Sequence, residues 1–161
     1  MIHVYTNPLL LDFVKVCLSM PQDERDQLEA FTGEKYDIDG AAVGNFTVPG
    51  PKWVIKWDDE PICIGGFVPQ RPGVYRDFML TTPGAWEKHW FAVTRIARRA
   101  MDGMLQNGAH RLECVAPAKR LADRSCIEKW YAAIGYNKEA TLHGYCASGA
   151  DAILFSRVRH I

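Results

Sequence analysis

The spacing at which apolar residues recur changes along the chain, and each change marks the start of another expected helix, strand or loop. Residues 2–5 predict a short strand, and residues 22–31 predict a polar helix. Residues 34–51 are rich in Gly, Asp and Ala and predict a loop with little regular structure. Residues 8–20 predict a helix, because five apolar side chains recur there at helical spacing: Leu9, Leu10, Phe13, Val14 and Cys17.

From residue 52 onward the pattern becomes that of strands. Residues 52–57 and 62–68 are apolar runs separated by the turn sequence of residues 58–61, so they predict an antiparallel hairpin. Residues 74–80 predict a third strand, which follows a second turn. This part of the chain therefore predicts three neighbouring strands connected in sequence order.

The second half predicts the longest helix over residues 86–105, which has a wide apolar stripe. A strand over residues 111–115 and a short helix ending near Ala133 follow, and a final hairpin joins residues 136–145 to 152–157. The late alternation of strands and helices implies a parallel strand pair joined by a crossover helix. The expected architecture is mixed α/β with a central twisted sheet.

Length and charge narrow the functional classes. The chain has 161 residues, with 19 basic against 19 acidic side chains, so we expect one domain over residues 1–161. A balanced charge argues against a nucleic-acid or anionic-membrane partner. No apolar run approaches the ~20 residues of a membrane span, and residues 1–6 lack the features of a signal peptide. We therefore expect a cytoplasmic protein.

The cysteines and histidines do not predict a metal site. The five cysteines are odd in number, and no two have the C-x-x-C spacing, so buried free thiols in a reducing compartment are expected. The histidines are scattered and show no ligand spacing, so no metal is expected: His3, His89, His110, His143 and His160.

Two stretches carry a resemblance to a known family. An apolar strand breaks at paired glycines in Pro61-Ile-Cys-Ile-Gly-Gly-Phe67, and a later helix ends in Trp130-Tyr131-Ala-Ala-Ile-Gly135-Tyr136. With the element order, these stretches resemble the Gcn5-related N-acetyltransferases (GNAT), over roughly residues 50–158. The resemblance implies an α/β fold with a mixed central sheet of six to seven strands and about four helices.

The chain more narrowly resembles the small GNAT-like proteins of short-tailed phages, of the internal virion protein A type. Three stretches support this likeness: residues 61–66, 78–82 and 125–135. The likeness implies a phage-encoded protein in the host cytoplasm, with phage structural or host proteins as further partners.

The GNAT resemblance implies an acetyl-CoA site between the strand that ends at Leu80 and the strand that ends at Val115. Backbone groups of Met79, Leu80 and Thr81 would hold the pantetheine arm. The family pattern Q/R-x-x-G-x-G/A holds the pyrophosphate, and residues 81–86 match it only at Gly84.

The start of the long helix retains features of an anion site. Thr82 suits an N-cap and Pro83 the first helical position. The amides of Gly84 and Ala85 and the side chain of Lys88 would then meet the phosphates. The alternative is a well-capped helix that binds only water.

The resemblance also implies an acid. Tyr131 occupies the position at which a GNAT tyrosine protonates the departing thiolate. The alternative is a core aromatic on an apolar helix face. The family often has asparagine where this chain has Arg124.

A carboxylate is the expected general base for an amine acceptor. Asp77 lies in the strand expected over residues 74–80, and Glu113 lies in the next strand, expected over residues 111–115. Burial of either carboxyl would raise its pKa into the range in which a general base can work. Both positions are also compatible with ordinary strand residues.

Two functional classes remain open from the sequence. The first is an acetyl-CoA-dependent N-acetyltransferase that transfers the acyl group directly to an amine on a small molecule or protein. The second is a catalytically inactive GNAT-fold protein of phage virion assembly or host interaction, suggested by the incomplete phosphate pattern and by Trp86 within it.

Overall fold

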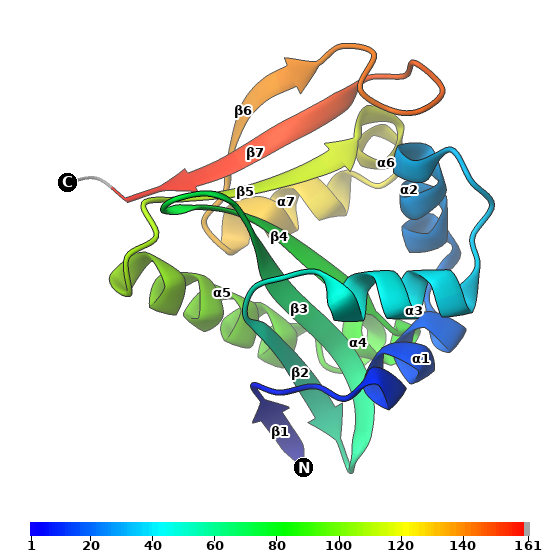
Figure 1. The fold of residues 1–161 in the computed structure, drawn as a ribbon, viewed down its shortest axis with the longest axis vertical. Helices are drawn as coiled ribbons and strands as arrows, with labels where there is room; N and C mark the ends of the chain where they lie inside the picture. Colours follow the sequence, from blue (N-terminus) through cyan, green and yellow to red (C-terminus); the bar gives the residue numbers. More distant parts are fainter. Residues whose placement is uncertain (160–161) are drawn as a thin grey trace.

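The computed structural model describes residues 1–159, which form a seven-stranded sheet covered by helices on both faces (Figure 1). The strands lie in the order β1-β2-β3-β4-β5-β7-β6, and all neighbours are antiparallel except β4 and β5. Their bounds are β1 Ile2–Tyr5, β2 Lys52–Trp57, β3 Glu60–Arg71, β4 Val74–Thr81, β5 Arg111–Pro117, β6 Asn137–Leu142 and β7 Ala152–Val158.

The described residues also form seven helices. Figure 1 shows α1 and α3 side by side over β3 and β4, whereas α5 lies behind the sheet. Their bounds are α1 Leu10–Ser19, α2 Gln22–Thr32, α3 Ile38–Thr47, α4 Pro83–Glu87, α5 Trp90–Gln106, α6 Ala118–Asp123 and α7 Ser125–Ala133.

The mixed α/β fold and the number of strands are confirmed. The described chain has seven helices where about four were expected, because α3 was expected as a loop and the short helices α4 and α6 were not separated in the sequence. His160, one of the histidines for which no metal-binding role was expected, lies outside the described residues.

The loop expected over residues 34–51 is wrong, because α3 occupies most of it. Asp37 caps this helix by accepting a hydrogen bond from the Gly40 amide at 2.7 Å. Ala42 is fully buried against α1, and the Phe46 ring contacts Phe13 edge-on at 5.6 Å. The glycines that suggested a loop are tolerated because tertiary packing holds the helix.

The single long helix expected over residues 86–105 is also wrong. It is divided into α4 and α5, with Lys88 and His89 between them. The His89 backbone (φ −128°, ψ 11°) departs from helical geometry, and its ring lies against Trp57 with centroids 4.4 Å apart. The break therefore leaves the five-residue α4 between β4 and the longer α5.

Alternation along the strands builds a separate core on each face of the sheet. Val54, Ile64 and Leu80 pack beneath α1 and α3. Trp53 and Met79 pack on the opposite face with α5 and α7. Side chains two positions apart share a face, so Asp77, Met79 and Thr81 of β4 all lie on the α5 face.

No helix within residues 1–159 combines the length and apolar character needed to cross a membrane.

Candidate active site

Strands β4 and β5 pair over only three positions and then separate. The paired positions are Val74 with Arg111, Tyr75 with Leu112 and Arg76 with Glu113. Beyond them β4 remains bonded to β3, and β5 remains bonded to β7. The two strands between which the donor site was expected, ending near Leu80 and Val115, are therefore parted in the structure.

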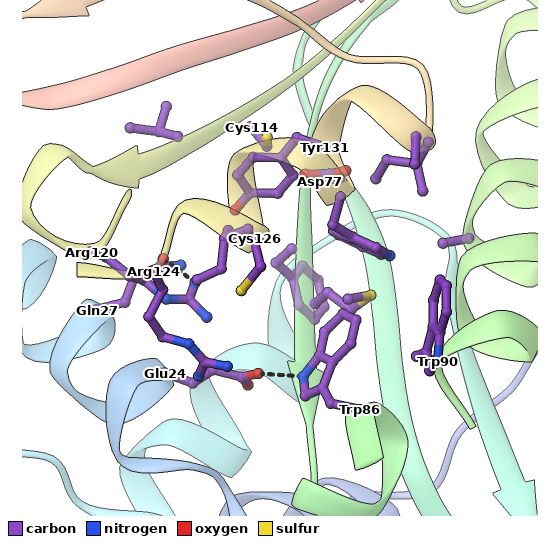
Figure 2. Close-up of a pocket in the computed structure, with 18 of the residues that line it drawn as sticks. Glu24, Gln27, Asp77, Trp86, Trp90, Cys114, Arg120, Arg124, Cys126 and Tyr131 are labelled. Carbon is purple, nitrogen blue, oxygen red and sulfur yellow. Dashed lines mark hydrogen bonds between the residues drawn. The ribbon is translucent and has the colours of Figure 1, made fainter. Parts of the chain in front are cut away.

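A cavity of about 480 Å³ opens at this parting. We call it the central cavity; its walls come from β2, β3, β4 and β5 and from α2, α4, α5, α6 and α7. Figure 2 shows side chains from several of these elements directed toward a common space. Separated parallel strands thus expose groups that a continuous sheet would have paired.

Asp77 lines the central cavity where the two strands part. Burial raises the pKa of its carboxyl to about 7, although a hydrogen bond from the Tyr136 hydroxyl opposes the shift. That hydroxyl donates to Asp77 Oδ2 at 2.6 Å. A carboxyl with a pKa near 7 can hold or release a proton at neutral pH, which suits a general base.

Tyr131 extends from α7 into the central cavity, close to Asp77 and Cys114 (Figure 2). Burial raises the pKa of its phenol well above the usual value, while the charge of Arg120 opposes the shift. The hydroxyl is therefore protonated at neutral pH. Its ring packs on Phe155 with centroids 4.8 Å apart, so the residue contributes to the core as well as to the cavity.

The Cys114 thiol lies in the same wall of the cavity. Burial raises its pKa well above the usual value, and the charge of Asp77 raises it further. A neutral thiol is a poor nucleophile. The Cys114 thiol is therefore poorly suited to act as a nucleophile.

Glu113 has a different environment. Its carboxylate pairs with Arg111 Nε at 2.7 Å and with an Arg76 terminal nitrogen at 3.2 Å. Burial raises the pKa of Glu113, but these hydrogen bonds outweigh burial and leave it below the usual value. Glu113 does not line the central cavity, and its pairs make it a poor proton acceptor.

The backbone of β4 offers groups to the cavity at alternate residues. The Thr82 amide bonds to Ile62 of β3, whereas the Thr81 amide points away from β3. Alternation therefore places the Met79 backbone groups on the open side and those of Leu80 toward β3. Leu80 is 3% exposed and packs in the core beneath α1.

A buried carboxylate on α2 was not anticipated from the sequence. Glu24 accepts hydrogen bonds from the Thr81 amide at 3.0 Å, from the Thr81 hydroxyl and from Trp86 Nε1 at 3.3 Å. Burial raises the pKa of Glu24 above its usual value, although the hydrogen bonds from Thr81 oppose this. Figure 2 shows the contact with Trp86 across the lower part of the cavity.

The start of α4 retains few free donors. The Ala85 amide bonds to the Thr82 carbonyl at 3.1 Å, and Pro83 has no amide hydrogen. Ala85 is fully buried, and neither Gly84 nor Lys88 lines the central cavity. The five-residue helix therefore offers little of the expected phosphate cradle.

Trp86 and Trp130 are two of the four tryptophans that line the central cavity. Trp86 meets Trp130 edge-on with centroids 5.1 Å apart, and Trp86 Nε1 also donates to the Thr81 hydroxyl at 2.7 Å. Trp130 Nε1 donates to the Thr94 hydroxyl at 2.8 Å. Both rings are thus held in the wall by hydrogen bonds at their polar edges.

Within residues 1–159, no three metal-ligating side chains gather at one point, and the five cysteines are free.

Comparisons with known proteins agree on the architecture. No family model and no curated protein matches the chain. An N-acetyltransferase from Staphylococcus aureus Mu50 aligns with a TM-score of 0.73 and 13% identity, over 98% of each chain. A GNAT-family acetyltransferase from Streptococcus pneumoniae aligns with a TM-score of 0.67 and 11% identity, over 99% of this chain and 100% of its own.

A third solved structure contains a ligand. An acetyltransferase from Bacillus subtilis in complex with CoA aligns with a TM-score of 0.64 and 13% identity, over 99% of this chain and 100% of its own. At such identities the likeness concerns the fold and not the individual side chains. The chain thus has the fold of the GNAT acetyltransferases over its full described length.

Proposed function

We propose that this protein is an N-acyltransferase that uses acetyl-CoA and transfers the acyl group directly to an amine. The observation that carries the proposal is the parting of β4 and β5, which opens the central cavity beside Asp77 and Tyr131. The fold shared with acetyltransferases, one of them solved with CoA, supports the same donor.

The proposed reaction assigns one proton transfer to each side chain. The amine nitrogen attacks the thioester carbonyl carbon, and Asp77 accepts the proton that the nitrogen loses. The carbon–sulfur bond then breaks, and the Tyr131 hydroxyl gives its proton to the leaving sulfur. The positive charge of Arg120 favours the phenolate that forms, and the Met79 backbone would hold the pantetheine arm.

Release of the CoA thiol from acetyl-CoA tests this proposal. We would assay the protein with a panel of small amines and peptides, and compare Tyr131→Phe with the control Tyr5→Phe on the exposed edge strand. Amine-dependent release is expected, and loss of the acid should slow it about 10²-fold or more. Absence of release with every amine, or equal rates in Tyr131→Phe, contradicts the proposal.

An inactive GNAT-fold protein that acts with phage structural or host proteins is the second candidate. One observation favours it: the amides of Thr81 and Ala85, which a donor would need, already have partners within the chain. Co-purification with phage structural proteins, together with unchanged function in Tyr131→Phe, would support this candidate over the enzyme.

A further inference from the structure

We infer that two basic side chains, Arg124 between α6 and α7 and Lys129 within α7, hold the phosphates of the acyl donor. The inference rests on the proposed function and moves the phosphate site away from the start of α4. The ligand class is a pantetheine thioester that carries phosphate groups, as acetyl-CoA does.

The start of α4 is poorly suited to phosphates. The amides of Thr81, Thr82 and Ala85 are all bonded within the chain. The Glu24 carboxyl accepts the hydrogen bonds of both the amide and the hydroxyl of Thr81. When this carboxyl is ionised, its negative charge would repel a phosphate. A donor entering the cavity needs another source of positive charge.

Basic side chains at the end of α6 and in α7 supply that charge. Arg120, Arg124 and Lys129 all line the central cavity and all come from α6, α7 or the residue between them. In Figure 2, Arg120 and Arg124 lie on the same side as Glu24, with Trp90 across the cavity. Three carboxyl groups also line the cavity, those of Asp23, Glu24 and Asp77, and of these only Asp23 pairs with an arginine of this group.

These three cations differ in how firmly they are held. Arg120 is fixed by Asp23 at 2.9 Å and by Gln27 at 2.6 Å, and its side chain is only 14% exposed. Arg124 pairs with Asp23 alone, at 2.8 Å, and its side chain is 47% exposed. Lys129 is exposed and makes no ion pair within residues 1–159. Arg124 and Lys129 therefore have donors left for a ligand.

Their position matches the path of a donor that reaches the parted strands. Cys126, Lys129, Trp130 and Ala133 recur at helical spacing, and all four line the cavity. Trp130 meets Trp86 of α4 on the other side, so this face of α7 borders the entry. A guanidinium can bind phosphate through two hydrogen bonds, and an ammonium adds a compact charge.

Calorimetric titration with two ligands tests the inference. Coenzyme A carries the phosphates, whereas pantetheine has the same thiol-bearing arm without them. We would compare the wild type with Arg124→Ala/Lys129→Ala and with Arg98→Ala/Arg99→Ala, which removes the same charge from an exposed part of α5. Melting curves would check that each variant is folded.

The inference predicts that Arg124→Ala/Lys129→Ala weakens CoA binding about tenfold or more. The same variant should leave pantetheine binding unchanged, and the α5 variant should change neither. Unchanged CoA binding, or equal loss for both ligands, would overturn the inference and leave the proposed function intact. A wild-type protein that binds neither ligand would overturn both.

Discussion

The proposed proton transfer from the amine depends on Asp77 and on the one side chain seen to donate a hydrogen bond to it, Tyr136. Burial in the wall of the cavity raises the pKa of this carboxyl to about 7, and the Tyr136 hydroxyl keeps it from rising further. A hydrogen bond to the charged form favours ionisation. In the proposed reaction, Tyr136 would therefore be a positioning residue that sets the pH at which Asp77 can act as a base.

The hydrogen bond between Tyr136 and Asp77 should affect the pH dependence of the reaction. We expect kcat/KM to rise with pH and level off, with a midpoint near pH 7, because only ionised Asp77 accepts a proton. Tyr136→Phe removes the hydrogen bond and should move the midpoint to higher pH. The steady-state pH profile measures both effects.

A profile whose midpoint stays fixed in Tyr136→Phe would contradict this role. Asp77→Asn provides the control, since it should lower the rate and remove the limb altogether.

Asp77 should also make folding stability depend on pH. Its folded pKa, about 7, lies above the ordinary 3.8, so between these values the native state holds a proton that the unfolded state has lost. Stability should therefore fall as pH rises from about 4 to 7, by up to ~1.4 kcal/mol for each unit. Urea unfolding at a series of pH values measures this slope.

Comparison with Asp77→Asn isolates the contribution, because the amide does not titrate. A slope equal to that of the wild type in this variant would assign the effect to other groups.

At the scale of elements, β2, β3 and β4 form one wall of the cavity, and this wall depends on a close contact between Trp53 and Gly65. Trp53 pairs in register with Gly65, which pairs in turn with Met79. The Trp53 ring covers Gly65 so closely that an added Cβ would lie 2.1 Å from Cζ2. Gly65 thus provides room for an indole that lines the cavity.

Gly65→Ala should destabilise the fold by about 1–3 kcal/mol, because the buried indole must move. Gly103→Ala in α5 is the matched control, since nothing lies within 4 Å of its added Cβ. There a helical alanine should be neutral or stabilising by up to about 1 kcal/mol. Chemical unfolding compares the two, and equal stability would contradict the packing described.

The sequence predicted elements where a strong period coincided with clear boundaries. The three central strands follow this rule, since alternation and turn residues agree. The helix α3 was missed because its glycines are offset by packing of Ala42 and Phe46 against α1. The break before α5 was missed because an apolar stripe continues across Lys88 and His89.

The site was only partly predictable for a related reason. Tyr131 and Asp77 stand out through a family pattern and a strand position, and the structure places both at the cavity. The contact between Glu24 and Thr81 joins residues 57 positions apart, so no local pattern announces it. Likewise, no local pattern predicts that Arg124 and Lys129 line the same cavity as Trp86 of α4.

At the scale of the whole molecule, the separation of β4 from β5 determines where the central cavity lies. The single parallel pair separates after three positions, and elements from both halves of the chain close around the gap. Helix α2 reaches β4 through Glu24, while α7 brings Tyr131 from the other side. The fold is that of the acetyltransferases, and in this chain the amides of Thr81 and Ala85 beside α4 are bonded internally.

Titration of the wild-type protein with acetyl-CoA in a calorimeter tests the central claim most directly. The account predicts saturable binding of one equivalent, because the parted strands leave a cavity of about 480 Å³ with free backbone groups along β4. Absence of binding at millimolar acetyl-CoA would contradict it.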